Sequence, residues 1–134
     1  MVEAKLRVIY GDTDQMGVVY YANYFRYFEF ARSELIRARG GHYRDVEAGG
    51  HFLPVIEASC RYRAPARYDD MLSIRVDVTD LKNASVTFRY EVRREADAAE
   101  LSTGQTVHAC VGRDGRPMRF PPHIAALLSP GGPA

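Results

Sequence analysis

Two aspartates in a polar loop near the N-terminus are the residues of this 134-residue chain best placed to do chemistry. Asp12 and Asp14 lie in the polar run 11–17, between an alternating segment and a segment rich in aromatic residues. A carboxylate can attack an electrophilic carbon directly, or it can deprotonate a water molecule as a general base. Aspartates in polar loops are also common turn residues, so their spacing alone leaves a structural role open.

The segment after this loop predicts a helix from Tyr24 to about Arg39. Apolar residues recur there at spacings of three and four, the mark of a buried helical seam: Tyr24, Phe28, Ala31, Leu35 and Ala38. Asn23 is the predicted N-cap and Gly40-Gly41 the predicted C-terminal stop. The aromatic first half of the helix predicts that other structure covers most of it. Its first amides have no intrahelical partner and can stabilise a developing oxyanion.

The rest of the chain predicts antiparallel strands. Residues 5–10 alternate, with Leu6, Val8 and Tyr10 on one face. From about residue 50 onward the sequence predicts only β structure, in segments 51–63, 72–79, 84–93 and 101–111. In the last segment, Val107, Ala109 and Val111 share one face. Short connections at 80–83 and 96–99 predict hairpins, and a sheet with one apolar face would curl around the apolar helix.

The order of strand, helix and four further strands predicts the α+β class, and the composition indicates a single globular domain. The chain is 46% hydrophobic and 26% charged, and its formal net charge of +1 gives no sign of a nucleic-acid partner. We predict one domain over residues 1–128, followed by a flexible, breaker-rich tail at 129–134. A chain this short often completes its core by oligomerising.

The cysteines, the histidines and the hydropathy pattern bear on metal binding and on cellular location. Cys60 and Cys110 are predicted to be free thiols, and the four histidines lack metal-ligand spacing. The charged N-terminus does not read as a signal sequence, and no apolar run reaches the ~18 residues expected of a membrane span. We therefore expect a cytoplasmic protein with no metal site.

The loop and the start of the helix carry a recognisable signature. Residues 10–24, followed by Glu29-Phe30-Ala31-Arg32, resemble the 4-hydroxybenzoyl-CoA thioesterase family, which includes the Tol–Pal-associated acyl-CoA thioesterases. Segments 63–70 and 81–85 and the Arg116-Pro117 turn add weaker similarity. The resemblance implies an α+β hotdog fold, in which a curled antiparallel sheet of about five strands wraps a long central helix.

The same resemblance implies a reaction. The matching carboxylate is Asp14, which would hydrolyse an acyl-CoA thioester as nucleophile or general base without metal or cofactor. A homodimer or homotetramer is implied, with the active site at the subunit interface. Many relatives acting on short-chain acyl-CoA carry histidine where this chain has Tyr21. Tyrosine there is more similar to the aromatic branch, so short-chain and aromatic (4-hydroxybenzoyl-like) acyl groups both stay open.

Several further residues are predicted to contact the substrate. The backbone N–H of Tyr21 is the predicted oxyanion donor, with a second donor near Phe52. CoA phosphates need cationic side chains and free amides. The resemblance implies that the hairpin at 82–85 contacts the nucleotide end of CoA, and Arg61, Arg63 and Arg67 are further candidates. The predicted substrate-binding residues are Gly17, Val18, Asn23, Phe52, Arg63, Lys82, Asn83 and Ser85.

Two other functions remain compatible with this fold. One is hydration or dehydration of an acyl thioester, although such hotdog enzymes usually use a histidine beside the helix, and the helix start has none. The other is binding of an acyl thioester without catalysis. The products separate the three, because only hydrolysis releases a free thiol.

Overall fold

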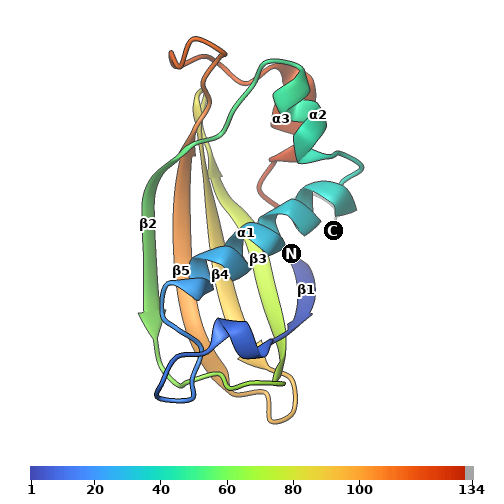
Figure 1. Ribbon diagram of the computed structural model, residues 1–134. Helices are drawn as coiled ribbons and strands as arrows, with labels where there is room; N and C mark the ends of the chain where they lie inside the picture. The colour runs from blue at the N-terminus through green and yellow to red at the C-terminus, as the bar shows by residue number, and fades with distance from the viewer. Residues whose placement is uncertain (132–134) are drawn as a thin grey trace.

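The computed structural model describes residues 1–131 and shows one antiparallel sheet with a long helix packed against it (Figure 1). The strands are β1 (Val2–Arg7), β2 (Val55–Tyr62), β3 (Met71–Leu81), β4 (Ser85–Arg94) and β5 (Glu100–Ala109). They lie in the order β1-β3-β4-β5-β2, and each neighbouring pair is antiparallel. This arrangement confirms the α+β hotdog fold predicted from the sequence.

In β3 and β4, apolar residues alternate with polar ones, so each strand has one apolar face. The inward-facing residues of β3 and β4 are buried, as predicted: Leu72, Ile74, Val76, Val78, Val86, Phe88, Tyr90 and Val92. Burying apolar surface on one face is what stabilises such a sheet. Both predicted hairpins, β3–β4 and β4–β5, are also confirmed.

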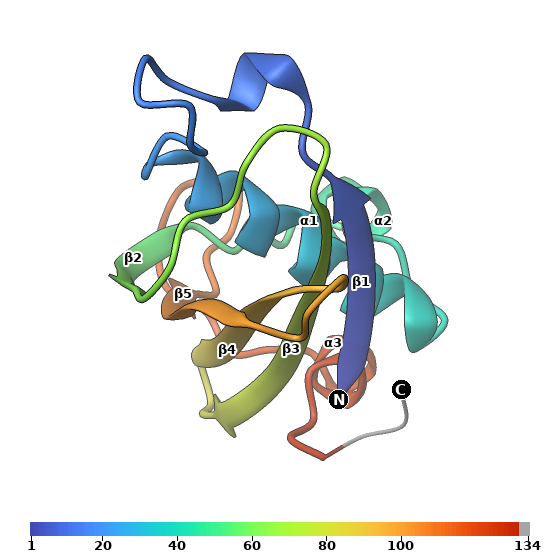
Figure 2. The same cartoon turned by 90° about the horizontal axis from the view of Figure 1, so that it is seen from below.

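The helix α1 (Asn23–Ala38) crosses the concave side of the sheet, which curls around it when seen from below (Figure 2). Its buried residues are Tyr24, Tyr27, Phe28, Ala31, Leu35 and Ile36. Ala38 is exposed, contrary to the predicted seam, because the helix ends beside it. The outer side of α1, with Arg26, Glu29 and Arg37, is exposed, so the sheet covers only one side of the helix.

Close packing of α1 against β5 depends on a glycine. A Cβ atom at Gly104 would lie 2.3 Å from Cε2 of Phe28 and 2.9 Å from the backbone oxygen of Ser59. Both distances are shorter than real Cβ contacts, so only glycine lets the Phe28 ring lie directly on the strand. Phe28 also stacks on Tyr90, with ring centroids 4.3 Å apart.

The N-terminal strand begins and ends earlier than predicted. Val8 is buried and Leu6 half-buried, as expected, but Tyr10 is 77% exposed. The chain leaves the sheet after β1 and forms the 3₁₀ turn η1 (Tyr10–Asp12), so the alternation no longer applies at Tyr10. The Tyr10 ring instead packs edge-on against Tyr68, 5.7 Å away.

Two short helices were absent from the sequence-based prediction. Helices α2 (Tyr43–Ala48) and α3 (Pro122–Leu127) both lie near the C-terminal end of α1, in the upper right of Figure 1. Arg39 ties this region together by donating hydrogen bonds to the carbonyls of Leu127 and Ser129, at 2.9 and 2.8 Å. Ser129, the first residue of the predicted tail, is therefore held. Residues 132–134 of that tail lie outside the described part of the chain.

The predicted apolar face of the last strand is wrong. Val107 and Ala109 are only half-buried, and the inward face carries Ser102, Gly104, Thr106, His108 and Cys110. This face of small and polar residues leaves room for α1, and its Thr106 and His108 side chains are hydrogen-bonded, as described below. The register with β2 and β4 therefore outweighs the weak hydropathy pattern.

Cys60 and Cys110 are free thiols, as predicted. Within residues 1–131, no helix has both the length and the apolar character needed to cross a membrane. In the same range, no three His, Cys, Asp or Glu side chains are grouped in a way that could hold a metal ion.

Candidate active site

Asp14 lies at the head of a tight turn just before α1. Its Oδ1 accepts a hydrogen bond from the backbone N–H of Met16 at 2.9 Å, and its carbonyl accepts one from Gly17 at 2.9 Å. Gly17 has a φ of +77°, a conformation that glycine adopts without strain. The backbone N–H of Asp14 donates to the carbonyl of Val18 at 2.9 Å, which closes the turn. The carboxylate is therefore held at a partly exposed position.

Asp12 is buried and organises the loop from inside. Its carboxylate accepts hydrogen bonds from the Tyr27 hydroxyl at 2.9 Å and from Arg26 at 3.2 Å. Burial, followed by this bond to Asp12, raises the pKa of Tyr27 well above its usual range. The Asp12 carbonyl accepts from the backbone N–H of Tyr20 and from Nδ2 of Asn23, each at 2.9 Å. Asp12 therefore ties the loop to α1, in keeping with its predicted structural role.

The prediction that Asn23 caps the helix is wrong. Asn23 is the first residue of α1, the N-cap position belongs to Ala22, and that cap has no side-chain hydrogen bond. The side chain of Asn23 reaches back to the Asp12 carbonyl instead. Asn23 therefore fixes the helix start relative to the loop. It does not line the cavity that contains Asp14.

The backbone around Tyr21 presents a donor at the start of α1. The Tyr20 carbonyl accepts from the N–H of Asn23 at 2.9 Å. In a trans peptide the N–H points opposite to the C=O, so the N–H of Tyr21 points out of the helix start. The Tyr21 carbonyl accepts a hydrogen bond from the hydroxyl of Tyr62 on β2, at 2.8 Å. Tyr62 therefore fixes this peptide from the edge of the sheet.

Asp14 and Tyr21 line the same cavity, which has a volume of about 290 Å³. Val18 and Arg63, both predicted to contact substrate, also line it, whereas Gly17 belongs to the adjacent turn. The remaining walls are mostly apolar: Met16, Val19, Tyr24, Tyr62, Ala64 and Pro65. Arg63 is half-exposed, with its guanidinium 2.8 Å from Glu100. The arrangement combines a carboxylate, a helix-start amide and an apolar wall.

The predicted CoA-binding hairpin lies at the other end of the sheet. Lys82, Asn83 and Ser85 follow β3, whose 11 residues span roughly 33 Å from the end nearest Asp14. The hairpin is closed by a hydrogen bond from the N–H of Lys82 to the carbonyl of Ser85, at 2.9 Å. Within one chain, the structure does not bring these residues together with Asp14.

The predicted second oxyanion donor is already engaged. The N–H of Phe52 donates to the carbonyl of Val111 at 2.9 Å. The neighbouring amides of His51 and Leu53 donate to the carbonyl of Val46 and the hydroxyl of Tyr43, at 3.2 Å each. This conformation therefore gives no free donor at Phe52.

A second cavity lies between α1, α2 and the start of β2, with a volume of about 310 Å³. Its lining mixes polar and apolar side chains, among them Glu29, Arg32, Tyr43, Leu53, Phe88 and His108. The sequence-based prediction missed this cavity, since its walls come from five separate elements: α1, α2, β2, β4 and β5. The sequence held one signal for it: in a strand, residues two apart face the same side, so His108 and Thr106 would be expected to lie side by side.

His108 is buried at the floor of this second cavity. A backbone carbonyl only accepts, so Nδ1 carries the proton and donates to the carbonyl of Leu53 at 2.9 Å. Nε2 then accepts from the Thr106 hydroxyl at 2.9 Å, and Thr106 accepts from the hydroxyl of Tyr90 at 2.6 Å. Burial lowers the pKa of His108 to about 4, so the imidazole is neutral near neutral pH.

Comparison with known proteins agrees with this fold. Residues 8–128 match the thioesterase-like superfamily. A solved structure of an Aquifex aeolicus hypothetical protein superposes with a TM-score of 0.91 at 30% identity, covering 96% of this chain and 100% of that one. An acyl-CoA thioesterase of Haemophilus influenzae is 31% identical over 124 residues, or 92% of this chain and 90% of the relative.

A 1,4-dihydroxy-2-naphthoyl-CoA hydrolase of Synechococcus elongatus is 33% identical over 108 residues, or 78% of each chain. The hotdog fold and the relatives named as acyl-CoA thioesterases identify the chain as a thioester hydrolase. The chain belongs to the thioesterase-like superfamily.

Proposed function

We propose that this protein hydrolyses a short-chain or aromatic acyl-CoA to the free acid and CoA, with Asp14 as nucleophile or general base. One observation carries the proposal: Asp14 and Tyr21, the latter with its N–H pointing out of the helix start, line one cavity before α1. Relatives named for acyl-CoA and 1,4-dihydroxy-2-naphthoyl-CoA hydrolysis support the substrate class.

Both routes use the same groups. In the first, an Asp14 oxygen attacks the thioester carbon, the C–S bond breaks, CoA leaves as thiolate, and water hydrolyses the mixed anhydride. In the second, Asp14 takes a proton from the attacking water, and that proton ends on the departing sulfur. The N–H of Tyr21 stabilises the oxyanion in either case, and one such donor is typically worth about 10²–10³ in rate.

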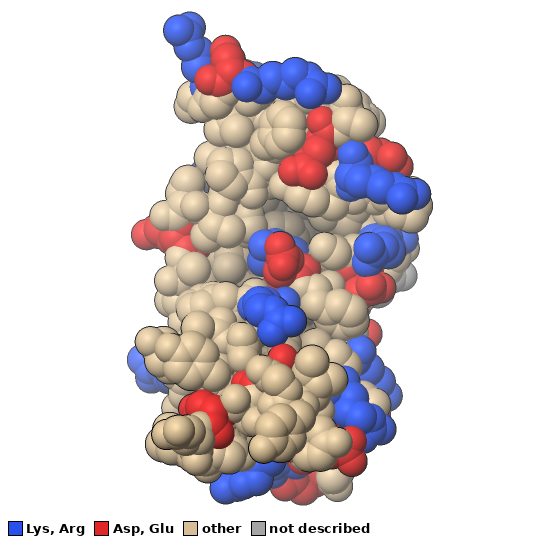
Figure 3. Space-filling model, viewed as in Figure 1, with Lys and Arg blue, Asp and Glu red and all other residues tan. Residues whose placement is uncertain are grey.

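A homodimer paired through β2 would complete the site. β2 is an edge strand whose residues are nearly all exposed, including Val55, Ile56 and Tyr62. Unpaired edges of this kind favour pairing with another strand. Figure 3 shows mostly uncharged surface over β2 and the loop before α1, with single charged side chains at its left edge and larger charged groups at the top and right. Two such dimers would make the alternative homotetramer.

Antiparallel pairing of two β2 strands supports an acyl pocket shared between subunits. The Tyr62 end of β2 adjoins Tyr21, whereas the Val55 end lines the second cavity. Pairing would bring the Val55 end of the second copy beside Asp14, and with it the second cavity and the hairpin at 82–85. A volume of about 310 Å³ fits a single ring or short chain, and the polar lining suits a hydroxylated ring.

CoA binding at Arg63, Lys82, Asn83 and Ser85 rests on this same dimer. Arg63 lies at the rim of the Asp14 cavity and could hold a phosphate of the subunit's own substrate. The other three residues could reach the nucleotide only from the second copy, given their distance within one chain.

A panel of acyl-CoAs tests the proposal. The panel contains acetyl, butyryl, palmitoyl, benzoyl, 4-hydroxybenzoyl and phenylacetyl thioesters, with thiol release followed by Ellman's reagent and products by mass spectrometry. Release of free CoA from a short-chain or aromatic member supports the proposal. Hydration with the thioester intact, or no turnover of any member, contradicts it.

A further inference from the structure

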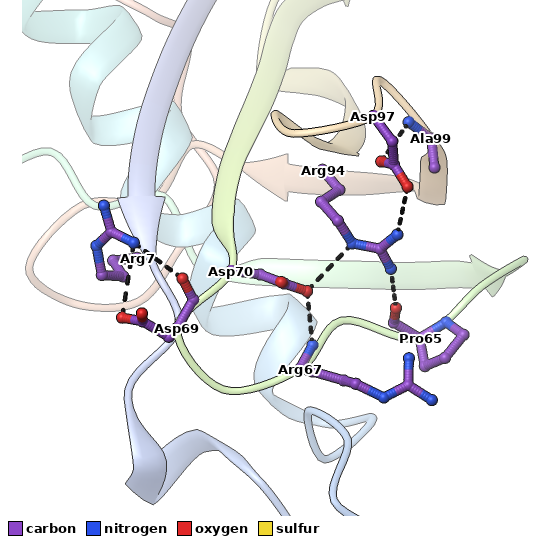
Figure 4. Close-up of polar contacts among 8 residues, drawn as sticks. All are labelled: Arg7, Pro65, Arg67, Asp69, Asp70, Arg94, Asp97 and Ala99. Carbon is purple, nitrogen blue, oxygen red and sulfur yellow. Dashed lines mark hydrogen bonds and ion pairs between the residues drawn. The ribbon is translucent and has the colours of Figure 1, made fainter.

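One half-buried arginine at the end of β4 holds the loop that forms a wall of the Asp14 cavity. That loop, residues 63–70, joins β2 to β3 and is called the anchor loop below. Arg94 is only 19% exposed and reaches it with two branches of its guanidinium. Nη2 donates to the carbonyl of Pro65 at 2.6 Å, and Nε donates to Oδ2 of Asp70 at 3.2 Å (Figure 4).

The rest of the network stiffens this contact. Nη1 of Arg94 donates to Asp97 at 2.8 Å, which fixes the guanidinium from the β4–β5 hairpin. Oδ2 of Asp70 also accepts from the backbone N–H of Arg67 at 2.9 Å, so the anchor loop is bound at both ends (Figure 4). A planar guanidinium holding three acceptors gives directional as well as electrostatic restraint.

The anchor loop in turn holds the Asp14 turn. The carbonyl of Ala66, a fully buried residue, accepts from the N–H of Val19 at 2.8 Å. The preceding residue, Val18, accepts from the N–H of Asp14 at 2.9 Å. Two backbone hydrogen bonds therefore separate the Asp14 backbone from the loop that Arg94 grips, and Pro65 itself lines the cavity.

We propose that Arg94 is a positioning residue of this hydrolase: it fixes the anchor loop, and the anchor loop fixes Asp14 against the substrate. The expected effect on catalysis rests on the proposed function. The chain of hydrogen bonds from Arg94 to the Asp14 turn is independent of that function. Arg94 lies outside the cavity and touches no reacting atom.

The matched pair of variants is Arg94→Met and Arg93→Met. Arg93, the next residue, pairs with Glu91 and Glu100 instead of with Pro65 and Asp70. Arg94→Met should lower kcat about 10–100-fold with KM within about threefold, because misplacing a reacting group by ~1 Å can cost ~10²-fold. The kcat of Arg94→Lys should lie between those of Arg94→Met and native protein. The kcat of Arg93→Met should stay within about twofold of the native value.

Two further readouts separate positioning from mere stabilisation. In an Asp14→Asn background, Arg94→Met should cause no further loss of rate, because the group being positioned is already gone. Native-state hydrogen exchange should show the Val19 and Arg67 amides exchanging at least about tenfold faster in Arg94→Met, with central β3 amides unchanged. If Arg94→Met fails to fold, the double variant Asp70→Asn/Arg94→Met takes its place. It also removes the Asp70 carboxylate, which the single variant leaves without its ion-pair partner.

Equal kcat for Arg94→Met and Arg93→Met would overturn the proposal, and so would unchanged exchange at Val19. A native protein that hydrolyses no acyl-CoA would refute the proposed function alone. In that case the exchange measurement still decides whether Arg94 holds the Asp14 turn.

Discussion

Mild acid should destabilise this protein through His108, and the size of the effect follows from its environment. Its pKa is lowered from 6.5 to about 4 by burial against Phe88 and Thr106. Between these two values the unfolded chain binds a proton that the folded chain does not, so the free energy of unfolding falls as pH falls. This single group should cost about 2 kcal/mol at pH 5 and about 3 kcal/mol at pH 4.

Urea unfolding at pH 7.5, 6, 5 and 4.5 measures this loss in native protein, His108→Asn and His123→Asn. Asparagine does not titrate, and its side-chain amide can replace the Nδ1–H bond to the Leu53 carbonyl. The pH 7.5-to-5 loss should be about 2 kcal/mol smaller in His108→Asn than in native protein. The exposed His123 serves as control, and its variant should follow native protein. Parallel curves for native protein and His108→Asn would refute the assignment of a buried, neutral imidazole.

Three other substitutions test separate parts of the account. Tyr62→Phe removes the hydroxyl bound to the Tyr21 carbonyl and should lower kcat about 3–10-fold, as expected for one hydrogen bond of about 0.5–1.5 kcal/mol; an unchanged kcat would count against this clamp. Gly104→Ala should cost at least about 1–3 kcal/mol in urea unfolding, and Phe28→Leu in the same chain should recover part of it. Ile56→Lys should convert a native dimer to monomer in light scattering, whereas a monomeric native protein would contradict pairing through β2.

Periodicity alone predicted the elements that bury a continuous apolar stripe. The seam of α1 and the alternation of β3 and β4 are strong because each inward position contacts the same core. The weaker pattern in β5 failed, since its inward face carries Gly104 under Phe28 and the hydrogen-bonded pair Thr106 and His108. Contacts with the neighbouring strands and with α1 decide which face of β5 points inward. The hydropathy of that segment alone does not predict these contacts.

The candidate site was predictable in part. Asp14 and Tyr21 were found because both lie in one contiguous motif, and the structure brings them to one cavity. Tyr62 was missed because its role depends on β2 lying beside the start of α1, a contact across 41 residues of sequence. Asn23 was misassigned because the same side chain that can cap a helix can also bind a loop carbonyl, here that of Asp12.

Thiol release by Asp14→Asn, measured on the best acyl-CoA, tests the central claim most directly. Asparagine keeps the acceptor for the Met16 N–H, so the turn survives while the carboxylate is lost. Asp114→Asn is the matched control, because Asp114 Oδ1 accepts from the Arg116 N–H at 3.0 Å in an equivalent turn far along the sequence. We predict that kcat/KM falls about 10²–10⁴-fold for Asp14→Asn and stays within about twofold for Asp114→Asn. Native-like activity of Asp14→Asn would contradict the assignment of Asp14 as the catalytic carboxylate.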